Sequence, residues 1–178
     1  MLERIPENLL DRVVTGTNLV PGSLRDQLVG RTLLVFLRHF GCVFCRETLG
    51  DLREASEADE SFPDVIFFSQ ASPMESRVFL RRYWPGARAV SDPDEFFYDG
   101  FGIERASKLT IFSPQVFAAK RRAAAKGHQG GERSGDIWRM PAAFVVEGDQ
   151  ILWAYEPKHP GDHPDFQAIP ALMLAASS

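Results

Sequence analysis

LLVFLRHFGCVFCRE, from Leu33 to Glu47, is the most informative stretch of this chain. It opens as an apolar run short enough to be a buried strand, and it then turns at Gly41. After the turn, apolar residues recur at helical spacing while charged residues occupy the opposite face. Cys42 and Cys45, with two residues between them, therefore stand where a strand ends and a helix begins.

This placement has chemical consequences for the two thiols. Unsatisfied backbone N–H groups and the positive end of the helix dipole favour an anion at a helix N-terminus. Both that position and the Cys-x-x-Cys spacing lower the pKa of a thiol, and the thiolate is the nucleophilic form. Residues three apart on a helix have Cα atoms about 5 Å from each other, within the window of about 4.4–6.8 Å that a disulfide accepts. The pair is therefore expected to open and close without unfolding the helix.

Strands and helices are expected to alternate through the first half of the chain, which favours parallel pairing through right-handed crossovers. Ser72, Pro73 and Glu75 form a helix start with a capping hydroxyl and a reciprocal carboxylate. Asp92 opens a segment rich in aromatic residues, interpreted as core filler rather than a substrate wall. The expected strands are 13–15, 32–37, 65–68, 87–90, 142–147 and 150–155, and the main expected helices are 42–61, 72–84, 109–125 and 164–176.

Three other interpretations compete with a redox role for the cysteines. Two buried structural thiols rarely fall by chance at a strand-to-helix junction. Half of a zinc site is disfavoured because no second cysteine pair exists and the histidines lack finger spacing. A permanent disulfide across so short a loop would add little stability. Because this spacing beside a βαβ pattern is typical of thioredoxin-like proteins, we interpret the pair as redox-active.

Length and composition limit the other classes. A chain of 178 residues has room for one domain, 1–178, with a surplus over a minimal thioredoxin-like core. The net charge of −4 argues against general nucleic-acid binding. The chain opens without an apolar signal segment, and no apolar run approaches membrane-spanning length. We therefore expect a cytoplasmic protein, in which a disulfide is more often catalytic than structural.

Two segments are expected to stand apart from the core of the domain. Residues 1–11 are predicted to form a peripheral N-terminal arm. Residues 120–135 form a basic stretch followed by a glycine-rich loop. Cations at a helix end followed by a solvated loop explain this stretch better than an anionic partner does.

A proline stands directly before the expected C-terminal β-hairpin. Met140-Pro141 precedes the apolar run 142–147, and Gly148-Asp149 forms the turn to the second strand. A proline at the start of a central strand is unusual because it cannot donate to the ladder. We predict that the Met140–Pro141 peptide bond is cis and lies against the cysteines, where it would align an extended substrate. An ordinary trans proline at the first strand position is the alternative.

Several motifs carry a resemblance to a known family. FLRHFGCVFCRE (Phe36–Glu47), YDGFGI (Tyr98–Ile103), Gly135-Asp136, MPAAFVV (Met140–Val146) and the ending Asp162-His163-Pro164-Asp165 are similar to the peroxiredoxin-like branch of the alkyl hydroperoxide reductase/thiol-specific antioxidant family. The likeness covers roughly residue 12 to the C-terminus. It implies a thioredoxin-like fold and a thiol-dependent oxidoreductase that needs no cofactor.

The resemblance leaves the attacking sulfur open. Typical peroxiredoxins carry Thr-x-x-Cys with the peroxide-attacking cysteine second, so Cys42 replaces that threonine and Cys45 occupies the peroxidatic position. Thioredoxins use the first cysteine, here Cys42, as the nucleophile and the second as the resolving thiol. A cysteine at position 42 is also suited to resolve a sulfenate on Cys45. Many relatives have glutamine before the Met-Pro pair, where this chain has Arg139, a candidate to hold an anionic thiolate or substrate.

Further candidates to tune the site are Arg38 and His39, which precede the cysteines closely. His39 as a proton donor and His39 as an ordinary loop histidine are equally good interpretations. His159 and His163 lie among prolines and glycines without a third ligand in view, so no metal site is expected.

The sequence thus predicts an α/β thioredoxin-like domain with a central mixed sheet flanked by helices and a C-terminal β-hairpin. Its Cys42–Cys45 pair is expected to cycle between dithiol and disulfide while reducing a peroxide or a disulfide substrate. An external thiol of the thioredoxin or glutathione type returns the pair to the reduced state. No nucleic-acid or membrane partner is expected, and a homodimer is left open. The rival hypothesis is a redox-sensing or catalytically inactive binding module that holds a partner on its aromatic wall.

Overall fold

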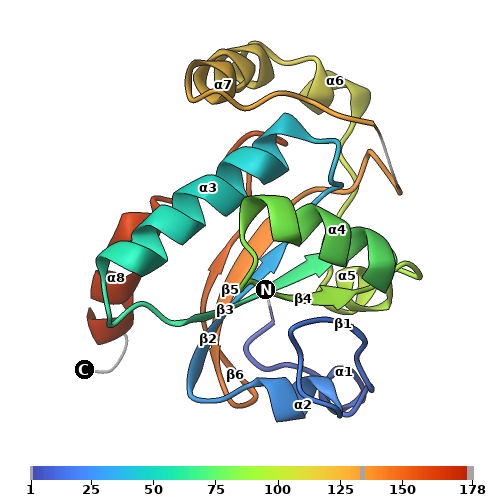
Figure 1. Cartoon of the computed structure of the whole chain (residues 1–178), viewed down its shortest axis with the longest axis vertical. Helices are drawn as coiled ribbons and strands as arrows, with labels where there is room; N and C mark the ends of the chain where they lie inside the picture. Colours follow the sequence, from blue (N-terminus) through green and yellow to red (C-terminus); the bar gives the residue numbers. More distant parts are fainter. Residues whose placement is uncertain (1, 133–134, 176–178) are drawn as a thin grey trace.

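A six-stranded mixed sheet forms the centre of the molecule (Figure 1). The computed structural model describes residues 2–132 and 135–175. Along the sheet the strands follow the order β1-β4-β3-β2-β5-β6, with β2 parallel to β3 and antiparallel to β5. The strands are β1 (Gly16–Thr17), β2 (Arg31–Phe36), β3 (Asp64–Ser69), β4 (Arg88–Ser91), β5 (Ala142–Glu147) and β6 (Gln150–Tyr155). The predicted α/β fold, its mixed sheet and its C-terminal hairpin are confirmed.

Helices cover both faces of this sheet. The helices are α1 (Glu7–Leu10), α2 (Leu24–Gln27), α3 (Val43–Ala58), α4 (Pro73–Tyr83), α5 (Phe96–Gly100), α6 (Lys108–Ile111), α7 (Pro114–Ala125), the 3-10 turn η1 (Phe166–Ala168) and α8 (Ile169–Ala175). Side chains of α3, α4, α7, η1 and α8 pack on one face, and those of α1, α2 and α5 pack on the other. The helix α3 lies across the sheet, and α7 stacks beyond its N-terminal end (Figure 1).

Strand β2 shows why the chain builds two cores. Leu33 and Val35 belong to the cluster beneath α3, whereas Leu34 and Phe36 belong to the cluster beneath α5. Because successive side chains of a strand point to opposite faces, a continuous apolar run fits only a strand that is buried on both sides. The apolar run that opens the Cys-x-x-Cys stretch therefore fixes β2 in the middle of the sheet, with the cysteines at its carboxyl end.

The aromatic segment after Asp92 fills the second core. The Asp92 carboxylate accepts hydrogen bonds from the N–H groups of Phe96 and Phe97 and so begins α5. The side chains of Phe97, Tyr98 and Phe101 are buried, which confirms their interpretation as core residues. The Tyr98 hydroxyl donates to the carbonyl of Phe68 at 2.9 Å and also to that of Leu37.

The expected helix over 109–125 is instead two helices. α6 ends at Ile111 and α7 begins at Pro114, with Ser113 in an extended conformation between them. A proline inside a helix lacks the N–H for the i−4 bond, and it disfavours the helical conformation of the residue before it. The break turns α6 away from α7 and leaves Phe112 exposed between them.

Two terminal segments also differ in detail from expectation. The first strand is Gly16–Thr17 rather than 13–15, and Val13 makes only an isolated bridge to Ser23. The C-terminal helix is divided into η1 and α8, and residue 176 of the expected range lies outside the described residues.

Residues 2–11, expected as a peripheral arm, contact the hairpin. The backbone N–H of Ile5 donates to Asp149, and that of Ile151 donates to Glu3. Leu9 and Leu10 are buried in the core beneath α5. No helix in the described ranges combines the length and apolarity that a membrane span requires.

Candidate active site

The two cysteines lie at the first turn of α3, as the sequence predicts. Cys42 is the N-cap residue, and its backbone N–H donates to the carbonyl of His39 at 3.0 Å. Cys45 lies three residues on, within the first turn. Both are free thiols, and they are 5% and 3% exposed, respectively. The pair therefore combines a helix N-terminus with nearly complete removal from water.

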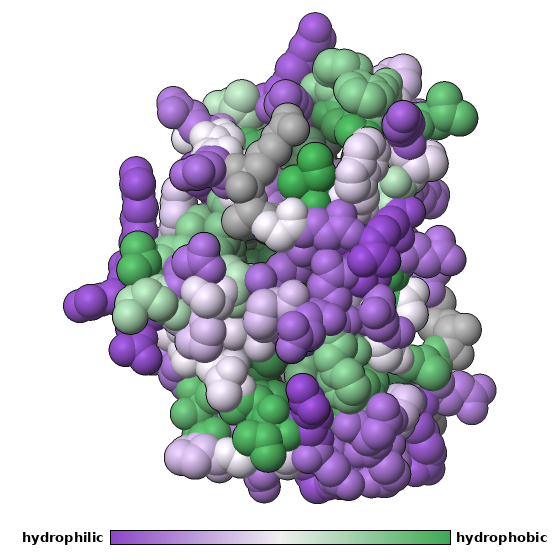
Figure 2. All heavy atoms as spheres, turned by 90° about the vertical axis from the view of Figure 1, so that its right-hand side faces the viewer, coloured by the Kyte–Doolittle hydropathy of each residue, from purple (hydrophilic) through white to green (hydrophobic). Residues whose placement is uncertain are grey.

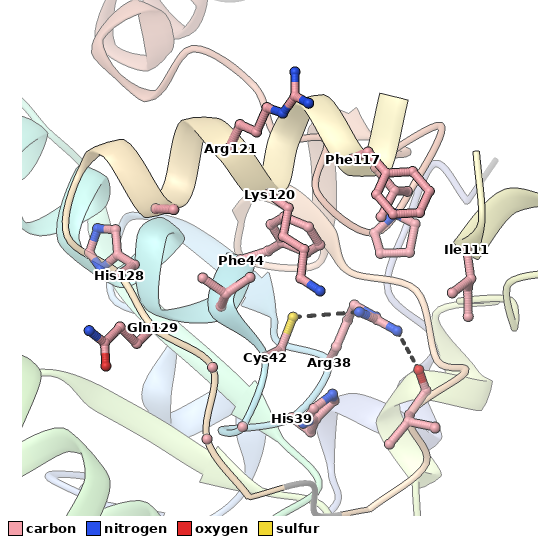
Figure 3. Close-up of a pocket in the computed structure, with 18 of the residues that line it drawn as sticks. Arg38, His39, Cys42, Phe44, Ile111, Phe117, Lys120, Arg121, His128 and Gln129 are labelled. Carbon is pink, nitrogen blue, oxygen red and sulfur yellow. Dashed lines mark hydrogen bonds between the residues drawn. The ribbon is translucent and has the colours of Figure 1, made fainter. Parts of the chain in front are cut away.

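Arg38 contacts both sulfur atoms. Its Nη1 donates to the Sγ of Cys42 at 3.5 Å, and its backbone N–H donates to the Sγ of Cys45 at 3.2 Å. The remaining guanidinium nitrogens bind backbone carbonyls: Nε donates to Arg139 at 2.9 Å and Nη2 donates to Ile137. Figure 3 shows the guanidinium between Cys42 and the 137 carbonyl. The segment before β5 thus holds a buried cation beside the first sulfur.

These contacts separate the acidities of the two thiols. A hydrogen bond from the Cys45 thiol, together with the charge of Arg38 and the N–H groups of Phe44 and Cys45, outweighs burial and lowers the pKa of Cys42 to about 6. Burial raises the pKa of Cys45 well above its usual range, and the hydrogen bond and charge of Cys42 raise it further. These contacts favour the thiolate form at Cys42 and the protonated thiol at Cys45.

Cys42 faces a cavity of about 990 Å³ between the start of α3 and the α6–α7 pair (Figure 3). The lining is largely apolar, and Lys120 extends from α7 into the cavity towards Cys42 and Arg38, whereas Arg121 points away from it (Figure 3). The lining side chains and backbone segments include Arg38, His39, Cys42, Phe44, Ile111, Phe112, Val116, Phe117, Lys120, Arg121, His128, Ile137, Trp138 and Pro160. The Cys42 sulfur is thus next to a largely apolar cavity, the kind of lining that small-molecule sites in proteins have.

The glycine-rich segment 127–132, here called the strap, passes in front of the turn that carries Cys42. The N–H of Gly131 donates to the carbonyl of Gly41 at 2.9 Å, and a Cβ added at Gly41 would lie 1.9 Å from the Glu132 carbonyl oxygen. Arg46 binds both sides of this contact, because its Nη1 donates to Gln129 (2.7 Å) and its Nε donates to Phe40 (3.2 Å). Only a residue without a side chain fits at Gly41 in this arrangement. Residues 133–134 of the expected 120–135 segment lie outside the described residues.

Ion pairs fix α7, the outer wall of the cavity, to α3. Glu47 is 0% exposed, and its carboxylate accepts from Arg122 Nε at 2.7 Å and lies 3.2 Å from Lys126 Nζ. Lys126 also pairs with Asp51 at 2.6 Å. Arg122 additionally donates to the Gly161 carbonyl at 2.8 Å, so it links α7 to the loop after β6. The basic residues at the end of α7 therefore have specific acidic partners.

The backbone of Arg139 lies next to the cysteine pair, but its side chain points away from the cysteines towards α5. Its guanidinium donates to the carbonyl of Ile103 at 2.6 Å and pairs with Asp99 at 2.8 Å and with Glu95. The contribution of Arg139 to the site is its backbone carbonyl, which accepts from Arg38. His39 lines the cavity and reaches Cys42 through its backbone carbonyl.

The predicted cis bond at Met140–Pro141 is wrong, since no cis peptide bond occurs within the described ranges. Pairing between β2 and β5 ends at Phe36 and Ala142, so Pro141 lies just outside the ladder. The N–H of Met140 donates to Glu104 at 3.0 Å, which keeps this segment extended. A trans proline therefore removes no ladder donor here. Pro141 still lies near the pair, because it lines a small internal cavity of about 30 Å³ together with Cys45.

One group of side chains has the composition of a metal site. Ligand atoms of Glu47, Asp51 and His163 lie within 4.8 Å of one another. The cationic groups of Arg122 and Lys126 already neutralise these carboxylates. The group therefore acts as an ion-pair network between α3 and α7.

Sequence patterns alone did not identify the residues of the outer wall. Phe117 and Lys120 enter the cavity because α7 folds back over the start of α3, and Trp138 enters it from the segment before β5. The available signal was Pro114, which marks the break that directs α7 across the cysteines.

The fold and the buried cysteine pair define a thioredoxin-like thiol protein. The family model for the AhpC/TSA antioxidant enzyme matches residues 51–159, more than half of the chain, and the chain belongs to this family. The matched region begins after Cys45, so the assignment does not depend on the cysteines themselves. The peroxiredoxin-like resemblance of the sequence motifs is thereby confirmed.

Individual proteins of known sequence or structure are also similar to this chain. Prostamide/prostaglandin F synthase from Sus scrofa is 26% identical and aligns with 99% of this chain and 90% of its own. The enzyme of the same name from Xenopus tropicalis is 27% identical, with 90% and 86% coverage. Among solved structures, peroxiredoxin Q from Xanthomonas campestris superposes with a TM-score of 0.63 at 14% identity, covering 97% and 96% of the two chains. A DsbE-type protein from Chlorobium tepidum superposes with 0.60 at 16%, covering 99% and 96%.

Proposed function

We propose that this protein is a thiol-dependent oxidoreductase in which Cys42 is the attacking thiolate and Cys45 the resolving thiol. The observation that carries the proposal is the difference in acidity between two sulfurs on one helical turn. The more acidic one, Cys42, lines the cavity, while Cys45 lies behind it. A nucleophile needs a low pKa and access, and a resolving thiol needs proximity to the first sulfur.

We propose reduction of an organic peroxide as the reaction. The Cys42 thiolate attacks one oxygen of the O–O bond, so that an S–O bond forms and the O–O bond breaks. The other oxygen leaves as an alkoxide and takes a proton from solvent, which yields an alcohol and a sulfenic acid on Cys42. The Cys45 thiol then attacks that sulfur, an S–S bond forms, the S–O bond breaks, and water leaves. An external reductant, either a dithiol of the thioredoxin type or two thiols of the glutathione type, reduces the disulfide and is itself oxidised to a disulfide.

Arg38 supports the attack on the peroxide in two ways. Its charge stabilises the thiolate of Cys42 before attack. The same guanidinium lies where negative charge develops on the leaving oxygen, which is the arrangement that electrostatic catalysis requires. Because the cysteine pair is largely shielded from water, the attraction between the Arg38 guanidinium and these negative charges is stronger than it would be in bulk solvent.

A disulfide substrate is the second candidate, and the match in fold to a DsbE-type protein favours including it. In that reaction Cys42 forms a mixed disulfide and displaces one thiolate of the substrate. Cys45 then displaces the second thiolate and leaves the same intramolecular disulfide. Both reactions therefore use the pair in the same order and differ only in the bond that is attacked.

Turnover assays with hydrogen peroxide, cumene hydroperoxide and a model disulfide, each with dithiothreitol as reductant, test the proposal. We expect turnover with cumene hydroperoxide, its loss in Cys42→Ser, and an accumulating sulfenic acid, trapped by dimedone, in Cys45→Ser. Mass spectrometry of the oxidised wild type is expected to show an intramolecular disulfide. Activity retained in Cys42→Ser would reverse the roles of the two cysteines. Oxidation without turnover of any substrate would instead support the redox-sensing module.

A further inference from the structure

We propose that the cavity in front of Cys42 selects an apolar molecule that carries a carboxylate, and that Lys120 is the residue that determines this specificity. The inference deepens the proposed function by naming the class of ligand that reaches Cys42. It rests on the charges and apolar surface of the cavity wall.

The apolar half of the site is an unpartnered surface on α6 and α7. Phe112 and Phe117 line the cavity, yet they are 69% and 57% exposed. Apolar residues gather at the end of the molecule that these two helices form, beside hydrophilic side chains (Figure 2). Aromatic rings at the mouth of a cavity that continues inwards past Phe44 and Val116 provide a continuous surface for a hydrocarbon body.

The charged half of the site is cationic only. Arg38 and Lys120 direct their charges into the cavity, Arg121 contributes to the lining but turns its guanidinium away (Figure 3), and none of the described lining residues is an aspartate or glutamate. The chain as a whole has 24 acidic and 20 basic residues, so this absence runs against its composition. An anion is the ligand whose charge complements such a wall.

Lys120 is distinguished from its basic neighbours by its contacts. On the same helix, Arg122 and Lys126 turn towards α3 and pair with its carboxylates. Arg38 is already committed to Cys42 and to two backbone carbonyls. Among the described residues no hydrogen bond or ion pair engages Lys120, and its ammonium extends into the cavity towards Cys42 (Figure 3). A carboxylate there would give the Lys120 ammonium the charge partner that no described residue of the protein supplies.

The carboxylate and the hydrocarbon bind to different parts of the wall. A carboxylate at Lys120 leaves the hydrocarbon to lie along Phe117 and Phe112 towards the mouth of the cavity. The ammonium of lysine is a compact point charge that does not require the bidentate geometry of arginine. A ligand with the same hydrocarbon but no carboxylate would bury the apolar surface and leave the Lys120 ammonium unpaired.

Titration calorimetry of the reduced protein with decanoate and with 1-decanol tests the inference without requiring turnover. We expect decanoate to bind the wild type more tightly than 1-decanol does and to protect Cys42 from iodoacetamide. Lys120→Gln should weaken decanoate binding by about tenfold, between the effects of exposed and buried charge pairs, and leave 1-decanol binding unchanged. Arg121→Gln is the matched control, because Arg121 lies one residue along the helix but points out of the cavity, and it should change neither affinity.

Three results would overturn the inference: no decanoate binding, equal affinity of the wild type for the two ligands, or an equal loss in Lys120→Gln and Arg121→Gln. Each is separable from failure of the proposed function. Peroxide turnover without decanoate binding overturns only the carboxylate specificity. Decanoate binding without any thiol turnover overturns only the proposed reaction. Because Lys120 is exposed and unpaired in the described structure, the variant is expected to fold normally, which circular dichroism checks.

Discussion

The guanidinium of Arg38 donates to the Sγ of Cys42 at 3.5 Å, while the backbone N–H of the same residue donates to the Sγ of Cys45 at 3.2 Å. One residue at the end of β2 therefore contacts both sulfurs with different groups. The charged group faces the thiol that ionises easily, and the neutral amide faces the thiol that does not. This relationship leads to the first two predictions.

A short pulse of iodoacetamide should label Cys42 before Cys45. The rate of labelling should rise with pH and reach half its plateau near pH 6, because the pKa of Cys42 is lowered to about 6 and the thiolate is the reactive form. Peptide mass spectrometry over a pH series measures this. Faster labelling of Cys45 would contradict the assignment and favour the arrangement of typical peroxiredoxins.

Arg38→Met should raise the pKa of Cys42 and slow its alkylation at pH 6. The substitution also leaves the buried carbonyl of Arg139 and the part-buried carbonyl of Ile137 without their donor, which should cost about 1–3 kcal/mol of unfolding free energy. Arg38→Lys keeps the charge and is expected to fall between wild type and Arg38→Met in alkylation rate. An unchanged pH profile in Arg38→Met would show that the guanidinium does not set the acidity of Cys42.

Glu47→Gln should destabilise the fold and flatten its pH dependence in acid. Burial opposes ionisation of this carboxyl, but hydrogen bonds and charges from Arg122 and Lys126 outweigh burial and lower its pKa. A lowered folded-state pKa gives stability above the unfolded-state pKa, and this stability is lost as the pH falls through the folded-state value. Breaking a fully buried pair costs about 3–5 kcal/mol, and the partial exposure of Arg122 reduces the expected cost to about 2 kcal/mol.

Urea denaturation between neutral pH and about pH 3 measures the Glu47 effect. Glu54→Gln on the exposed side of α3 is the control, and it should change the unfolding free energy by less than about 0.5 kcal/mol. Equal effects of the two variants would show that the ion pairs between α3 and α7 add nothing to stability.

Gly41→Ala should destabilise the protein and expose Cys42 to alkylation. The added methyl group would meet the backbone oxygen of Glu132, so the strap must move away from the turn, at a cost of about 1–3 kcal/mol. Gly86→Ala is the matched control, since its Cβ would meet nothing closer than 4.0 Å. Thermal unfolding and the alkylation rate of Cys42 are the readouts. A Gly41→Ala protein with the stability and alkylation rate of wild type would show that the strap does not cover this turn.

Elements with a clear local pattern were predictable from the sequence. The apolar runs of β2 and β5 identified central strands, and the capping box at Ser72 and Glu75 fixed the start of α4. The cysteine pair was placed correctly for the same reason, since a change of period marks the junction between β2 and α3. Local rules were sufficient wherever neighbours in sequence decide the structure.

Long-range contacts decided the remaining features. Arg139 was expected to face a thiolate or substrate, but Glu95 and Asp99, some 40 residues away, hold its side chain. The bond before Pro141 is trans, and Pro141 lies one residue outside the β2–β5 ladder, an end that the hydropathy pattern does not reveal. Lys120 was noted only as the start of a basic stretch at a helix end, because its position beside Cys42 depends on the packing of α7 over α3.

The two ends of α7 differ in how they are attached to the rest of the protein, and this difference has a consequence for protein engineering. Its last turns are tied to Glu47 and Asp51, whereas its first turns and α6 form the outer wall without such ties. The residues that set thiol acidity lie on the segment 36–47, far in sequence from that wall. Substitutions over 109–121 should therefore change which molecules enter while leaving the thiol chemistry as it is. Variants of residues 109–121 could therefore give proteins that share the same cysteine pair but differ in the ligands that their cavities admit.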